Sequence, residues 1–178
     1  MSPHHTRFLI LEQGAGSAIF NLLLNAGIAW LMFRQHDSVP FWGRESIAGD
    51  TLGTCFFLPL FTALIVTPLV RRRIRAGTIE PLHWTRASHA WLGWLPAGTF
   101  KRGAVLGLAC LAVVGPLTLL LLARASVDAL ALVPFITFKA LFAALLALVV
   151  TPVISIWALA VPAVVVGGTS PANPTAPA

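Results

Sequence analysis

Four long apolar stretches limit what this chain can fold into more than any other feature. They cover residues 8–33, 51–70, 103–123 and 133–160. A bilayer has a hydrocarbon core about 30 Å thick, which takes about 20 helical residues to cross. Because lipid offers no hydrogen bonds, a crossing segment must pair its backbone groups internally, and segments of this length do so as helices. We therefore predict an all-α, polytopic membrane protein with four transmembrane helices.

The composition favours a membrane protein over a soluble one. Of the 178 residues, 57% are apolar and 10% are charged, whereas soluble domains average about 25% charged residues. The net charge of +6 is compatible with a nucleic-acid partner, but seven of the 12 Lys and Arg residues lie between Arg71 and Arg102, beside apolar stretches. Basic residues placed in this way flank membrane spans, so we expect the lipid bilayer as partner and no nucleic acid.

The basic residues also predict an orientation. Arg7 and the basic residues of the 71–102 loop fall on one side, against Arg34, Arg44 and Arg124 on the other. Loops rich in Lys and Arg stay in the cytoplasm. We therefore expect both termini and the central loop on the cytoplasmic side of a cell membrane.

We expect a single transmembrane domain over residues 1–166, a central cytoplasmic loop at 71–102, and a disordered tail at 167–178 that is rich in Gly, Pro and Ala. Tryptophans recur at helical spacing over residues 81–95, which predicts a short helix in the membrane interface. This helix is either a tether between the spans or a binding site for anionic lipid or a protein partner. The candidate headgroup contacts are Arg71, Arg72, Arg73, Arg75, Trp84, Trp91 and Trp94.

An internal repeat relates the second and fourth stretches. Residues 63–70 read ALIVTPLV and residues 147–154 read ALVVTPVI, with five of eight positions identical at an offset of 84 residues. This predicts two tandem hairpins related by an axis along the membrane normal. Proline cannot donate to the carbonyl four residues back, while the preceding threonine hydroxyl can bond a carbonyl one turn back. We expect helix bends, static or hinged, at Thr67, Pro68, Thr151 and Pro152.

Two of these features resemble a known family. Asn21 in the first stretch, and the run TPLV at 67–70 followed by a basic stop, resemble uncharacterised small bacterial membrane proteins built from one or two two-helix hairpins. The second half of the chain lacks the matching asparagine and the basic stop. The resemblance implies a hairpin fold in the inner membrane of a bacterium, and it implies no activity.

Polar residues of the first stretch recur at steps of four. Gln13, Ser17, Asn21 and Asn25 therefore lie along one face of a helix, which should contact other helices. We interpret them as groups that hydrogen-bond between helices. The alternative is that they line a polar pathway.

Lys139 is a charged residue within the fourth stretch. Asn25 and Thr54 should lie at a similar depth, with Asp50, the expected cap of the second helix, slightly nearer the outer surface. Either these side chains form a cluster with Lys139, or the long stem of Lys139 carries its ammonium to the outer headgroups. We favour the second interpretation. The candidate polar site comprises Gln13, Ser17, Asn21, Asn25, Thr54 and Lys139.

The sequence gives no support for catalysis or metal binding. The histidines, at positions 4, 5, 36, 83 and 89, lie outside the apolar stretches, which argues against haem held between helices. No cluster has metal-ligand spacing. Cys55 and Cys110 fall at different depths, so we expect free thiols. We expect no cofactor. Gly103-x-x-x-Gly107 has a spacing that allows close helix contact.

These observations favour a non-enzymatic accessory, scaffold or assembly subunit, with a homo-oligomer or another membrane protein as partner. The alternative is a small oligomeric transporter or channel with a polar site around Asn21, Asn25 and Lys139. An enzyme that acts at headgroup level through His83 and His89 ranks third.

Overall fold

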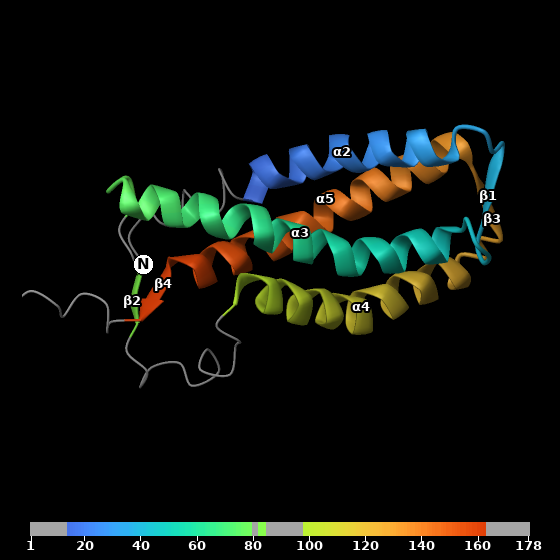
Figure 1. The fold of residues 1–178 in the computed structure, drawn as a ribbon. Coiled ribbons are helices and arrows are strands. Elements are labelled where there is room, and N and C mark those ends of the chain that lie inside the picture. Colours follow the sequence, from blue (N-terminus) through green and yellow to red (C-terminus); the bar gives the residue numbers. More distant parts are fainter. Residues whose placement is uncertain (1–13, 80–81, 85–97, 163–178) are drawn as a thin grey trace, which may run out of the picture.

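The structure, a computed structural model, describes residues 14–79, 82–84 and 98–162. Figure 1 shows them as a bundle of long helices with short strands at both ends. The four helices are each long and apolar enough to cross a membrane, which confirms the predicted all-helical, multi-pass architecture. The elements are α2 Gly16–Phe33, α3 Ile47–Arg75, α4 Thr99–Arg124 and α5 Leu132–Leu159, with strands β1 Ser38–Pro40, β2 Leu82–Trp84, β3 Ala129–Ala131 and β4 Ala160–Pro162.

The two longest helices, α3 and α5, lie at the centre of the packing. α3 packs against both α4 and α5, and α2 packs against α5. Although α2 and α3 are consecutive in the chain, they have little direct contact. Figure 1 shows α5 running diagonally from α2 across α3. This arrangement leaves a gap between α2 and α3 that has α5 as its floor.

Strand pairs join the loops at each end of the bundle. β1 pairs antiparallel with β3, with Val39 opposite Leu130, and β2 pairs in parallel with β4. We refer to these two ends as the β1–β3 end and the β2–β4 end (Figure 1).

Several small side chains lie in the interior beside larger ones, and many large apolar side chains lie on the outside. The central cluster includes Cys55 and Ala63 of α3 and Ala143 and Ala147 of α5, whereas residues such as Val149 remain 66% exposed. Packing by small residues is typical of helices solvated by lipid. The thiols of Cys55 and Cys110 are both free and buried, as predicted.

Glycines of α4 allow its backbone to approach α3. A Cβ atom on Gly107 would lie 2.6 Å from the carbonyl oxygen of Phe56, and one on Gly103 would lie 2.9 Å from the Cβ of Ala63. Real Cβ atoms do not approach so closely, so these positions accept only glycine unless the helices separate. The predicted close contact at Gly103-x-x-x-Gly107 is confirmed.

The Thr-Pro steps lie inside continuous helices. Pro68 is within α3 and Pro152 is within α5, so neither proline ends its span. The hydroxyl of Thr151 is buried and has no hydrogen-bond partner among the described residues. The expected bond from this threonine to a carbonyl one turn back is therefore not formed.

The central loop differs from the prediction where it is described. Leu82–Trp84 form strand β2 rather than the start of an interfacial helix, because they pair with β4, about 80 residues later in the chain. The rest of that predicted helix, including Trp91 and Trp94, lies outside the described residues, as do Gln13 and the predicted disordered tail.

The α3–α4 contact predicts the effect of a small substitution. Gly107→Ala forces its new methyl group against the Phe56 backbone, so we expect a loss of about 1–3 kcal/mol in unfolding free energy, measured by denaturation in mixed micelles. Gly27→Ala is the matched control, since a Cβ there meets nothing within 4 Å. Equal stability of the two variants would contradict the close contact.

Candidate functional site

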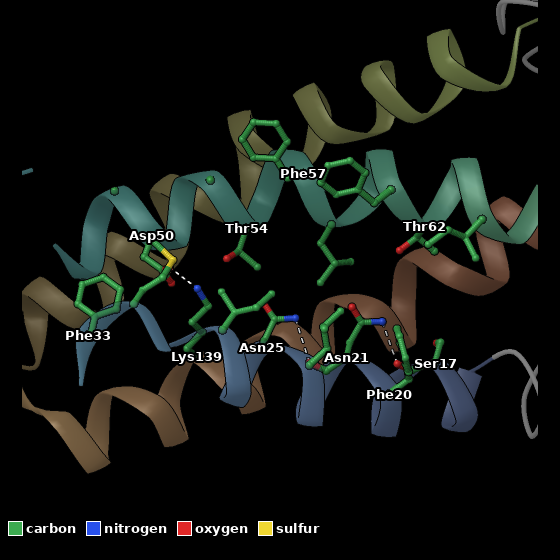
Figure 2. Close-up of a pocket in the computed structure, with 18 of the residues that line it drawn as sticks. Ser17, Phe20, Asn21, Asn25, Phe33, Asp50, Thr54, Phe57, Thr62 and Lys139 are labelled. Atoms are coloured by element: carbon green, nitrogen blue, oxygen red, sulfur yellow. Dashed lines mark hydrogen bonds and ion pairs between the residues drawn. The ribbon is translucent and has the colours of Figure 1, made fainter. Parts of the chain in front are cut away.

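A cavity of about 540 Å³ occupies the gap between α2 and α3. Its lining runs from Ser17 to Phe33 on α2 and from Arg44 through the start of α3 to Val66, with Lys139 of α5 in the floor. We call this cavity the α2–α3 groove (Figure 2). Phe20 and Phe61 on its two walls are 60% and 55% exposed. The groove is therefore open along its side, in the direction that lipid would occupy around a membrane-spanning bundle.

An ion pair between Lys139 and Asp50 lies at the groove, toward the β1–β3 end. Figure 2 shows the ammonium of Lys139 directed from α5 at the Asp50 carboxylate on α3. The two side chains are 5% and 10% exposed. Charges so far from water are stable only when paired, and the pair joins the two central helices.

The expectation that Lys139 reaches the headgroups is therefore wrong. Lys139 follows Phe135 by one turn on the face of α5 that is buried in the bundle, so its stem points inward and meets Asp50 before it could reach the surface. Asp50 is not the cap either, because Ser46 caps α3 by accepting a hydrogen bond of 3.1 Å from the amide of Gly49. Of the alternative cluster, the contact between Lys139 and Asp50 is formed, and Thr54 and Asn25 line the same groove.

The asparagines of α2 bond within their own helix. The Asn21 side-chain amide donates to the Ser17 carbonyl at 2.9 Å, and that of Asn25 donates to the Asn21 carbonyl at 2.9 Å. Their side-chain oxygens face the groove (Figure 2) and have no hydrogen-bond partner within the described parts of the chain. The contact between helices comes from Ser17, whose hydroxyl lies 3.5 Å from the Ala147 carbonyl of α5.

Charged residues surround the mouth of the groove at the β1–β3 end. Arg44 and Glu45 both line it, and Glu45 forms a contact of 2.9 Å with His36. Asp50 is paired with Lys139. Arg44 is exposed and has no ion-pair partner among residues 14–79, 82–84 and 98–162. Arg44 is thus a cation at the mouth that forms no ion pair within the described residues.

The groove brings together five of the six predicted polar-site residues, namely Ser17, Asn21, Asn25, Thr54 and Lys139. The predicted bends at Thr67, Pro68, Thr151 and Pro152 lie elsewhere. Sequence reasoning missed Thr62, Phe57 and Arg44. Thr62 had a usable signal, because Asp50, Thr54, Leu58 and Thr62 recur at steps of four on α3 and so form a second stripe that faces the one on α2.

Within the described residues no group of three or more His, Cys, Asp or Glu could hold a metal ion. Comparisons of the chain with protein-family models, curated proteins and solved structures gave no match.

The ion pair predicts strong coupling between two substitutions. Lys139→Met leaves the Asp50 carboxylate buried and unpaired, and Asp50→Asn leaves the Lys139 ammonium buried and unpaired. Each substitution should lower the unfolding free energy by about 2–4 kcal/mol. The double variant should recover most of that loss, because it buries no charge. A double-mutant cycle of micellar unfolding measures the coupling, and strictly additive losses would contradict the pair.

Proposed function

We propose that this protein is a non-enzymatic accessory or scaffold subunit of the membrane that holds a membrane-embedded ligand in the α2–α3 groove. One observation carries the proposal: the groove opens along its side, between apolar walls that include Phe20 and Phe61. A ligand can then enter from the bilayer without crossing water. The volume of about 540 Å³ is in the range of small-molecule sites, about 300–1,000 Å³.

The charges in the groove favour binding of a ligand over transport of a solute. The ammonium of Lys139 is already neutralised by Asp50, and both asparagine amides are used within α2. A pathway for an ion or polar solute would need these groups to exchange partners during each passage. A binding groove needs no such rearrangement.

The orientation that we propose places the β2–β4 end in the cytoplasm of a bacterial cell. Arg71, Arg72, Arg73 and Arg75 lie in the last turns of α3 at that end, where the positive-inside rule puts them and where anionic headgroups of the inner membrane can bind them. The groove then opens at its mouth toward the outer surface.

We also propose that the chain arose by duplication of a two-helix hairpin. The packing agrees with two-fold symmetry along the membrane normal, since α2 on α5 corresponds to α4 on α3. β1 and β3 follow the first helix of each hairpin and pair with each other. Asn21 and Asn25 have no counterparts in α4, so the groove belongs to one half only.

A transporter is the second candidate, because ionisable residues inside a membrane often mark ion or proton paths and Lys139 and Asp50 both line the groove. The asparagine oxygens and the hydroxyls of Thr54 and Thr62 would continue such a path along the groove. This candidate differs from the first in requiring that a solute cross the bilayer through the purified protein.

Site-specific photo-crosslinking tests the binding function. We expect a photoreactive phenylalanine analogue at Phe61, on the groove wall, to give a discrete adduct in cells. The analogue at Val113 is the control, because that residue of α4 is 66% exposed and does not line the groove. If both positions gave the same mixture of bulk lipid adducts, the groove would hold no particular ligand.

A further inference from the structure

We propose that the ligand of the α2–α3 groove is an anionic lipid, with one hydrocarbon chain between α2 and α3 and its acidic headgroup on Arg44. This inference rests on the proposed binding function and specifies the class of ligand. It follows from the shape of the groove, from the charge at its mouth and from the composition of its walls.

The groove is long. The lining of α2 extends from Ser17 to Phe33, about 24 Å at 1.5 Å per residue. An extended hydrocarbon chain can lie along a groove of this length, in contact with both walls.

The walls fit an apolar part of the ligand, and the mouth fits an anionic part. Leu24 and Ile28 on α2 face Phe57 and Ile65 on α3 across the groove, and all of them keep at least 39% exposure that a chain would cover. At the mouth, Glu45 is in contact with His36 and Asp50 is paired with Lys139. Arg44 has no ion-pair partner within the described residues. It can bind a phosphate or carboxylate, which guanidinium groups contact with two parallel hydrogen bonds.

Two polar side chains in the α2 wall make this binding reversible. The side-chain oxygens of Asn21 and Asn25 are acceptors that a hydrocarbon chain cannot satisfy, and covering them costs free energy. A chain should therefore bind less tightly than to a wholly apolar groove. Asn21→Leu removes one such acceptor and should strengthen retention of the chain.

Native mass spectrometry on the full-length protein tests the inference. The protein is released from vesicles of equal phosphatidylglycerol and phosphatidylcholine, and in a second arm is incubated with oleate. We expect phosphatidylglycerol to be retained about five-fold over phosphatidylcholine, from about 1 kcal/mol for one arginine near an anionic lipid. Retention of oleate in preference to phosphatidylglycerol would identify a fatty acid as the source of the same chemistry.

Matched variants locate the site. Arg44→Gln should abolish the headgroup preference, while Arg124→Gln, at the same end of the bundle but away from the groove, should preserve it. Leu24→Trp should expel the chain by filling the groove, and Leu23→Trp should not, because Leu23 is 65% exposed and lies outside the lining. Micellar unfolding of each variant verifies that it is folded.

Three results would overturn the inference: equal retention of the two phospholipids, an unchanged preference in Arg44→Gln, or loss of lipid in Asn21→Leu. A protein adduct at Phe61 in the crosslinking experiment would contradict the lipid while leaving the binding function intact. Absence of any adduct specific to Phe61 would instead contradict the binding function itself.

Discussion

Lipid as the solvent of the outer surface is the constraint on which the whole structure depends. The described helices carry large apolar side chains outward, such as Leu145 at 64% and Val149 at 66% exposure. Several glycines and alanines lie at the contacts between helices. In water such a surface would aggregate. In a bilayer no hydrophobic force drives the helices together, so close backbone contact and internal polar pairs must do so. The glycines of α4 and the Lys139–Asp50 pair meet this need on two sides of α3.

The groove follows from how these contacts are distributed. α2 packs against α5 and has little contact with α3, so the two helices of the first hairpin stay apart. On the other side of α3, the glycines of α4 allow close contact between helices. The polar side chains then gather in the open space: Asn21 and Asn25 from one wall, Thr54 and Thr62 from the other. The walls therefore combine apolar and polar side chains, with Arg44 at the mouth, and it is for this groove that we propose an amphipathic molecule of the bilayer.

The sequence predicted the helices because hydropathy over about 20 residues depends on the solvent and little on the partners of each residue. It also predicted that Asn21, Asn25 and Ser17 share a face, because four-residue steps fix it. Lys139 was misjudged since a sequence gives the depth of a residue and leaves open the direction in which its side chain points. Leu82–Trp84 were misjudged because a strand depends on its partner, here about 80 residues away, and local spacing carries no trace of it.

The central claim is that the groove lies open to the bilayer along its side. Spin labels at Phe61 and at Val113, in a protein whose Cys55 and Cys110 are replaced, measure this directly through their collision rates with dissolved oxygen in reconstituted membranes. The account predicts that both labels are reached by oxygen at similar rates, because both positions are more than half exposed and face lipid. A label at Phe61 that oxygen reaches as rarely as it reaches one at the fully buried Ala143 would show that α2 and α3 close over the groove, and would contradict the account.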